Sequence, residues 1–512
     1  MSIAQPAAAL SGWPARTAAV RLLPAAIAVI GVPFAAFTSL VLYHFYVRGS
    51  FVLDAGLQAF LLSHGGLRLP YPAALGGGLY WRSHVAPIFV LLSLLRRALP
   101  VSDVQFFAGF IGLAHALPAI AAFWALRAAG ARGAAATAAA ALIAIAFAFN
   151  GLALAIVRYP HFEMLIVGSI ICFMIALAQR RVALAAVFCA LALATREDAG
   201  FHLFALLFLL IAVNRWYGVA WRDQRAELCF AAIGFAYSFG VVAAQMAWAA
   251  GPSALAQIYT GEAPFATLTA ARIATRLIGC LVFRAYLVLP AVVAAIWAVR
   301  ARNPYLLIGY AAFVPWGALQ IIAHSDIAGT LSGYYAYPFM IASFWPLVAV
   351  IYRGGAAASR ALATMAGFTA MIAASFVGIG HQYNPGRLAL PSAFLSPPSL
   401  ARQAGTDRAV ALLARSRPAL GRLVVDTSVV ALAPDDFSRG ETVTGAGAAP
   451  PDTVVYMSQG YEAKTLRQIA HADGISRRYR VPGTGIRIAT DRPLGPSVPL
   501  ASLLVVAGSG GD

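Results

Sequence analysis

Long apolar stretches recur along this sequence, and they restrict what the chain can fold into more than any other feature does. The composition is 61% hydrophobic and only 11% charged, and a soluble protein could not bury so much apolar surface. A helix needs about 20 apolar residues to cross a bilayer. The sequence therefore predicts an all-α membrane protein with about eleven spans, at residues 23–46, 104–126, 134–157, 162–178, 182–195, 199–214, 226–249, 284–299, 304–323, 334–352 and 361–380.

Arginine marks the short connections on one side of this arrangement. Two or three arginines lie in or beside the connections that follow the second, fourth, sixth, eighth and tenth spans. Cytoplasmic loops of membrane proteins carry such an excess of positive charge. The pattern predicts a cytoplasmic N-terminal tail at residues 1–22, a transmembrane domain at residues 23–380 and a C-terminus outside the cytoplasm.

Two segments on the predicted outer side are long enough to fold by themselves. The first outer loop, residues 47–103, contains two stretches that could be short helices lying along the membrane surface, at 53–63 and 85–98. After residue 380 the apolar runs shorten, and proline and glycine become frequent. Residues 381–512 are predicted to form a small extracytoplasmic α/β domain, with helices at 408–415 and 464–472, strands at 423–430 and 453–457, and one or two strands at 479–489.

Acidic residues and histidines collect on this same outer side. Charge beside or within a membrane is costly and usually functional, so the outer face is predicted to be the chemical face. Asp54 comes first, a few residues after the first span and among apolar neighbours. Its carboxylate could act as a general base, or it could cap the following helix. Gln58 lies four residues later and would share a helical face with Asp54.

Two further outer connections carry dense polar clusters. His161 and Glu163 lie in a tight turn, where they could hold a metal or orient a substrate hydroxyl, or could act only as interfacial caps. Arg196 could bind a phosphate with two parallel hydrogen bonds. Glu197 and Asp198, next in sequence, could line the site or cap the helix that follows. Short flanking spans suggest that this second connection is recessed below the surface.

Other polar residues are assigned more ordinary roles. Tyr334, Tyr335 and Tyr337 head a span, as interfacial aromatic residues often do, and His202 is expected to be packed or interfacial. The four cysteines lie in apolar stretches without partners at metal-ligand spacing, so no structural metal site is predicted. The net charge of +18 is largely that of the loop arginines, so we expect no nucleic-acid partner.

The order of the outer motifs resembles a known family. The chain resembles the prokaryotic membrane family called domain of unknown function 2079, which is similar to the GT-C superfamily of polytopic glycosyltransferases. The resemblance covers roughly residues 25–380, and each motif is short, so its specificity lies in order and spacing. The motifs are Asp54–Ala59, His64–Gly65, His84 with Pro87, the turn around His161 and Glu163, and Arg196–Asp198.

This resemblance implies hexosyl or pentosyl transfer in a prokaryotic plasma membrane. A sugar would move from a polyprenyl-phosphate donor to an envelope acceptor on the outer face. Asp54 would be the base, with Glu163 and His161 assisting it. Cationic side chains would stabilise the leaving phosphate electrostatically. The residues implied for substrate or phosphate binding are Arg196 first, then Arg158 and Arg82, with Glu197, Asp198, Gln58 and His84.

Alternatives of other classes stay open at this point. The chain could be a lipid or glycan transporter, for which polar residues in the middle of the spans would be expected. It could also be a non-catalytic scaffold that presents its outer domain, for which the charged outer residues should be dispersed and solvated. No cofactor is implied with certainty, and a divalent cation remains an open alternative with only two candidate ligands close in sequence.

Overall fold

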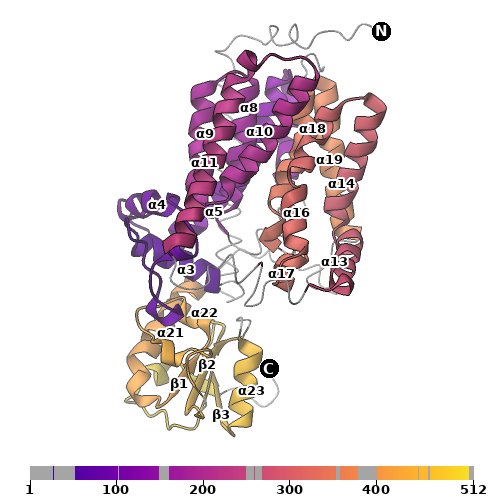
Figure 1. Ribbon diagram of the computed structural model, residues 1–512. Helices are drawn as coiled ribbons and strands as arrows, with labels where there is room; N and C mark the ends of the chain where they lie inside the picture. The colour runs from indigo at the N-terminus through magenta and orange to yellow at the C-terminus, as the bar shows by residue number, and fades with distance from the viewer. Residues whose placement is uncertain are drawn as a thin grey trace.

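The computed structural model describes a helical bundle joined to a small sheet domain (Figure 1). It covers residues 27, 31, 52–101, 103–148, 161–248, 259, 268–331, 333–352, 358–378, 400–447, 449–458 and 462–506. The predicted span 23–46 lies outside the described residues apart from two single positions, and so do Arg158 and the end of the stretch 134–157. Helices occupy every later predicted stretch, from 104–126 onward.

The helices of the bundle follow one another along most of the chain. In the first outer loop they are α3 (Val52–Ser63), η3 (Ala73–Leu75), η4 (Tyr80–Arg82) and α4 (Ile88–Arg97). The remaining elements are α5 (Asp103–Ala128), α6 (Ala134–Ala148), α8 (Met164–Ala178), α9 (Val182–Thr195), α10 (Ala199–Trp216), η5 (Trp221–Gln224), α11 (Arg225–Trp248), α13 (Ala270–Phe283), α14 (Ala285–Ala301), η6 (Pro304–Leu307), α15 (Ile308–Ala312), α16 (Val314–Ile321), α17 (Asp326–Gly329), η7 (Gly333–Ala336), α18 (Pro338–Tyr352) and α19 (Ala358–Gly378).

The apolar helices identify a membrane protein, but they do not confirm eleven crossings. Four described helices are long and apolar enough to cross a bilayer: Gln105–Ala128, Ala199–Trp216, Trp221–Trp248 and Pro304–Ile321. The pair Ala270–Phe283 and Ala285–Ala301, bent by 81°, would make a fifth. The other described apolar helices are shorter than 18 residues or less apolar. The predicted stretch 304–323 also departs from a single helix, because it is divided into η6, α15 and α16.

Helix α8 lies at the centre of the bundle. All fifteen of its residues are buried, which is the state expected for a helix that is apolar on every side. It packs against α5, α9 and α18. Glu163 stands at its N-cap, so this carboxylate is placed where the central helix begins.

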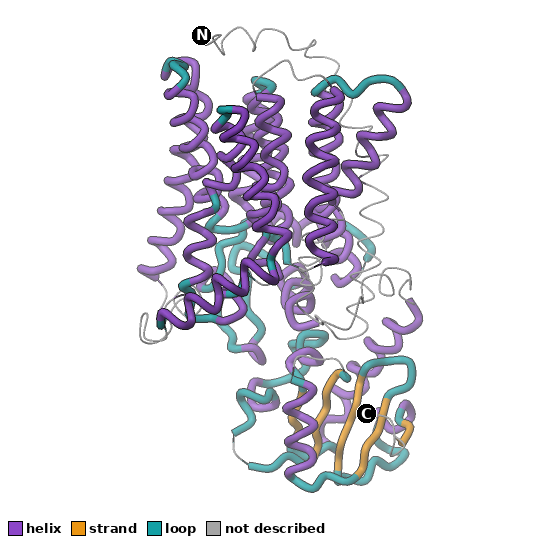
Figure 2. The backbone as a smooth tube through the Cα atoms, turned by 90° about the vertical axis from the view of Figure 1, so that its right-hand side faces the viewer, coloured by secondary structure: helices purple, strands orange, loops and turns teal. Residues whose placement is uncertain are grey.

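The C-terminal part forms a sheet covered by a helix on each face (Figure 2). Its helices are α21 (Leu400–Ser416), α22 (Thr427–Val430) and α23 (Ala463–Ala472). Five strands pair in the order β1-β2-β4-β3-β5, and only β1 and β2 are parallel. The strands are β1 (Leu423–Val425), β2 (Thr453–Met457), β3 (Arg477–Arg480), β4 (Ile486–Thr490) and β5 (Val505–Val506).

Alternation along β2 assigns its side chains to the two faces. Val455 and Met457 pack with residues of α21, whereas Val454 and Tyr456 pack with residues of α23. The prediction of one strand over 423–430 is wrong in its second half, since β1 ends at Val425. Asp426 then accepts a hydrogen bond from the Ser428 amide and starts α22. This short helix lies against α3 of the bundle.

Candidate functional site

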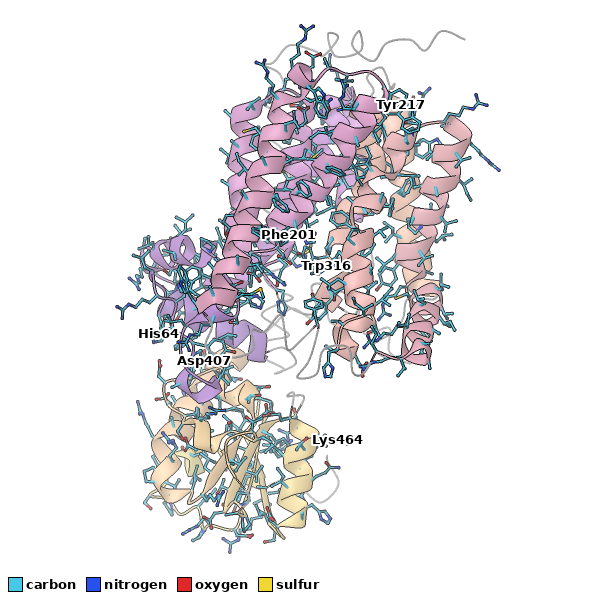
Figure 3. The ribbon with its side chains drawn as sticks, in the orientation of Figure 1. His64, Phe201, Tyr217, Trp316, Asp407 and Lys464 are labelled. Atoms are coloured by element: carbon cyan, nitrogen blue, oxygen red, sulfur yellow. The ribbon has the colours of Figure 1, made fainter. Side chains whose placement is uncertain are left out.

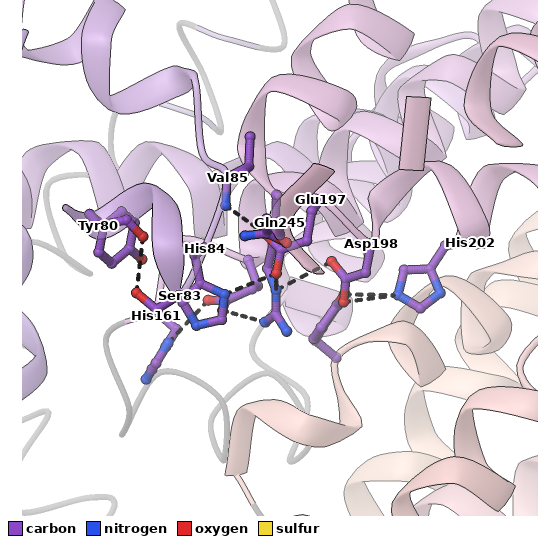
Figure 4. Close-up of polar contacts among 12 residues, drawn as sticks. Tyr80, Ser83, His84, Val85, His161, Glu197, Asp198, His202 and Gln245 are labelled. Carbon is purple, nitrogen blue, oxygen red and sulfur yellow. Dashed lines mark hydrogen bonds and ion pairs between the residues drawn. The ribbon is translucent and has the colours of Figure 1, made fainter. Parts of the chain in front are cut away.

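The polar connections of the bundle gather at the end that meets the sheet domain. His64 lies at this end, and Tyr217 lies at the opposite end (Figure 3). Three segments distant in sequence meet there: the first outer loop around His84, the start of α8 at Glu163, and the connection between α9 and α10. Figure 4 shows the resulting group of polar contacts. We call His84, His161, Glu163, Arg196, Glu197 and Asp198 the carboxylate cluster.

Arg196 is the centre of the carboxylate cluster. It follows the last residue of α9 in an extended conformation, which turns its side chain back toward the start of α8. Its guanidinium lies 2.7 Å from Glu163, 3.3 Å from Asp198 and 3.6 Å from Glu197. The side chain is only 10% exposed. One buried cation is therefore shared by three carboxylates.

Glu163 is ionised in the folded protein. Its Oε1 accepts a hydrogen bond from Arg196, and its Oε2 lies 3.2 Å from His161 Nδ1. Burial opposes ionisation, but His161 and Arg196 outweigh it and lower the pKa of Glu163 to about 2. Glu163 is thus suited to hold charge and position its neighbours, and poorly suited to take up a proton near neutral pH.

Glu197 fastens the first outer loop to the cluster. Its Oε1 lies 2.9 Å from His84 Nδ1, and its Oε2 accepts a 2.9 Å hydrogen bond from the Val85 amide. Burial opposes ionisation here as well, but His84 and Arg196 lower the pKa of Glu197 below its ordinary value. Both oxygens have partners, so Glu197 joins the first outer loop to the connection between α9 and α10.

Asp198 is in a different electrostatic state. Burial raises its pKa to about 6, with a smaller contribution from the neighbouring Glu197 and Glu163 charges that Arg196 opposes. The Tyr337 hydroxyl donates to Asp198 Oδ2 at 3.3 Å and lies 2.8 Å from His202 Nε2. Among the described carboxylates of the cluster, Asp198 is the one that can exchange a proton near neutral pH.

Tyr337 corrects the interpretation of its segment as an interfacial aromatic belt. The residue has 0% exposure, and its ring packs with His202 and Trp316. The side chain of Tyr334 is not described, and Tyr335 is buried. The sequence signalled only that a tyrosine precedes Pro338 at the head of a span. Its partner His202 is separated from it by 135 residues, a pairing that one sequence does not reveal. His202 itself is packed, as expected.

The cluster carries more acid than arginine. Three carboxylates surround the one guanidinium of Arg196. Such a group favours the approach of a cationic or hydroxyl-bearing ligand. No group of three or more His, Cys, Asp or Glu side chains within the described residues is arranged to hold a metal ion.

The other candidate residues lie outside this cluster or cannot be placed in it. Asp54 belongs to α3, but its side chain is not among those described. Gln58 is buried in the same helix, and its Oε1 has no hydrogen-bond partner within the described part of the chain. Arg82 is exposed at the end of η4, two residues before His84. Arg158 lies outside the described residues.

Comparisons with known proteins leave the family open. No family model matches the sequence, and no curated protein sequence matches it. A solved structure of similar overall arrangement is ArnT from Cupriavidus metallidurans bound to undecaprenyl phosphate. It shares 12% sequence identity and gives a TM-score of 0.48, over 90% of this chain and 97% of that chain. The resemblance to domain of unknown function 2079 stays a prediction.

Proposed function

We propose that this membrane protein transfers a sugar from a polyprenyl-phosphate donor to an acceptor of the cell envelope. The observation that carries the proposal is the carboxylate cluster, where three buried acids share one arginine at the end of an apolar bundle. A structural protein gains little from such a group, because desolvating the charges offsets much of their attraction. The order of motifs that resembles GT-C glycosyltransferases then suggests the chemistry.

The reaction needs one proton acceptor and a way to stabilise a departing phosphate. The acceptor hydroxyl loses its proton to a carboxylate while its oxygen bonds to the anomeric carbon. The bond from that carbon to the phosphate oxygen breaks, and polyprenyl phosphate leaves with the electron pair. General-base catalysis of this kind contributes about 10²–10⁴-fold to the rate. Electrostatic stabilisation of the leaving phosphate supplies a further part of the acceleration.

Asp54 is the first candidate for the base, because it matches the position of that residue in the family the chain resembles. Asp198 is the second candidate, since its pKa of about 6 fits a group that gains and loses a proton near neutral pH. Glu163 and Glu197 remain ionised and fully engaged, so we assign them to positioning. His161 and His84 would hold these two glutamates in position through the contacts at 3.2 Å and 2.9 Å.

Arg196 takes a different role from the one first expected. A phosphate beside it would also meet three carboxylates, and their repulsion would cancel much of the attraction. We therefore propose that Arg196 holds the carboxylates in place, and that the leaving phosphate is met by Arg82 and Arg158. Arg82 suits this role because it is exposed beside the anchored His84.

The side of the membrane follows from the arginine loops at the other end of the bundle. If those loops are cytoplasmic, the carboxylate cluster and the sheet domain face outward, where polyprenyl-phosphate sugars are used. The donor sugar would be a hexose or a pentose. The acceptor would be a glycan, a lipid or a protein of the envelope.

Reconstituted full-length protein tests the proposal directly. Liposomes containing it would be supplied with a panel of polyprenyl-phosphate hexoses and pentoses and with membrane extracts as acceptors. We expect release of polyprenyl phosphate, and loss of at least about 10²-fold in rate in Asp54→Asn or Asp198→Asn. Asp223→Asn, an exposed carboxylate at the opposite end, is the matched control. Passage of intact donor across the membrane without release of phosphate would instead establish a transporter.

A further inference from the structure

Helix α3 and the sheet domain touch through backbone. A Cβ built on Gly56 would lie 2.5 Å from the Ala431 carbonyl oxygen and 2.6 Å from its Cβ. Such a contact cannot be relieved by a side-chain rotation, so only glycine lets α22 approach α3 this closely. Gly56 lies two residues before Gln58, which places the contact on the side of α3 away from Gln58. The sheet domain therefore rests directly on the helix that carries the first candidate base.

A hairpin leads from α3 back toward the carboxylate cluster. Leu69 and Tyr80 are joined by a 2.9 Å hydrogen bond from the Tyr80 amide, and the Tyr71 amide donates to Gly78 at 2.9 Å. The turn uses three consecutive glycines, 76–78, all with positive φ. Two paired arms and a closed turn make this segment a stiff connection rather than a loose loop.

The tip of the hairpin is inserted into the sheet domain. Ala74 is 2% exposed and belongs to the apolar core that α21 forms with the sheet, and Leu75 packs against that core. The exchange is reciprocal, because Ala431 of the sheet domain belongs to the apolar core of the bundle. Ala73, one residue before Ala74, is exposed. The tip of the hairpin therefore contacts the sheet domain through Ala74 and not through Ala73.

The other end of the hairpin is bonded to the carboxylate cluster. The His84 amide donates to the Tyr80 carbonyl, and His84 and Val85 then bind Glu197. Gln245 at the end of α11 donates to the Trp81 carbonyl at 3.1 Å. A continuous series of contacts thus runs from the core of the sheet domain to Glu197, which lies beside Arg196.

We infer that the sheet domain positions the candidate site, by holding α3 through Gly56 and the hairpin through Ala74. Binding of a partner or acceptor to the sheet domain would be transmitted to Glu197 along the hairpin. That the transmitted change alters catalysis rests on the proposed function, whereas the mechanical connection does not. Gly56 and Ala74 are positioning residues in this scheme, since neither touches the carboxylate cluster.

Hydrogen exchange on the full-length protein in lipid nanodiscs tests the connection without any activity assay. In Ala74→Arg we expect the amides of residues 80–85 to exchange at least about tenfold faster, because their anchor is released. Ala73→Arg places the same charge one residue away on the exposed side and should leave these amides unchanged. A faster exchange in both variants, or in neither, would overturn the inference.

A second pair of variants covers the case in which Ala74→Arg unfolds the sheet domain. Gly56→Ala pushes α22 from α3 and should also speed exchange at residues 80–85, while the amides of β2 and β4 stay protected. Gly66→Ala, where an added Cβ meets nothing within 4 Å, is the control. Unchanged exchange at 80–85 in Gly56→Ala would refute the connection. If no sugar transfer is ever found, these exchange results still decide the inference.

Discussion

The two ends of the helical bundle differ in how many carboxylates an arginine binds. At the end with the short arginine-rich connections, side chains bind backbone carbonyls close by in sequence. Arg127 donates to the carbonyl of Ala131, and Arg215 donates to that of Val219, each four residues ahead. These bonds satisfy carbonyl groups just beyond helix C-termini, where the helix dipole also favours positive charge. Arg180 is an exception at this end, since its guanidinium lies 3.4 Å from the carboxylate of Glu227, which is 47 residues away.

At the other end one arginine binds carboxylates brought from two helix starts. Arg196 reaches Glu163, which is 33 residues away, besides its neighbours Glu197 and Asp198. No helix terminus needs so much acid, and water is largely excluded from the group. The comparison shows that Arg127 and Arg215 complete helix ends and that Arg180 pairs with one carboxylate, whereas three carboxylates are concentrated around the buried Arg196. Three desolvated carboxylates around one cation are the arrangement that we explain in terms of function.

The largest effect expected from breaking this contrast is that of Arg196→Ala. Removing the shared cation leaves three buried carboxylates without compensation, and losing one partner of a buried ion pair costs about 3–5 kcal/mol in the free energy of unfolding. We expect a large fall in the apparent melting temperature of the detergent-solubilised protein, together with loss of the contacts between His84 and Glu197.

Arg222→Ala at the opposite end is the control for this prediction. Its side chain is 80% exposed and lies 3.9 Å from Asp223, so its loss should change the free energy of unfolding by no more than about 0.5 kcal/mol. Equal destabilisation by the two variants would mean that the carboxylate cluster is energetically ordinary.

The periodicity of apolar residues predicted helices and strands, but it did not predict contacts between residues distant in sequence. Helical stretches from 104–126 onward and the strand Thr453–Met457 follow from apolar runs and their period, so they occur where predicted. That the acids lie on the outer side stays a prediction from the alternation of the loops along the chain. Tyr337 was missed because its burial depends on contacts with α10, far away in sequence. The contact of Arg196 with Glu163 could not be predicted either, because 33 residues separate the two in sequence.

The next largest effect concerns pH and separates Asp198 from its neighbours. Its folded pKa of about 6 lies above the ordinary value of 3.8, so the folded state binds more protons between these values. Stability from this group is therefore greatest at low pH and falls by about 2 kcal/mol at most as the pH rises from 4 to 6. Asp198→Asn should remove this fall and flatten the profile of melting temperature against pH.

Glu163→Gln should change the dependence of stability on pH in the opposite direction to Asp198→Asn. The folded pKa of Glu163 is lowered from 4.5 to about 2, so its contribution is present above about pH 4.5 and lost as the pH falls toward 2. We expect Glu163→Gln to lose stability at neutral pH and to lose less on acidification than the parent protein. Profiles of the same shape for both variants would contradict the assignment of different proton states within one cluster.

The smallest effect tests whether Tyr337 completes the cluster through its hydroxyl. Tyr337→Phe keeps the ring and deletes the group that lies between His202 Nε2 and Asp198 Oδ2, which should cost about 1 kcal/mol in the free energy of unfolding. The Asp198 carboxylate also loses a donor, so its pKa should rise and the melting profile should shift toward higher pH.

Tyr310→Phe is the matched control, because the buried Tyr310 hydroxyl makes no hydrogen bond within the part of the chain that the structure describes. A buried hydroxyl without a partner contributes nothing when kept, so Tyr310→Phe should be neutral or slightly stabilising. If Tyr337→Phe also leaves both stability and the pH profile unchanged, Tyr337 is a packed ring and the cluster ends at Asp198.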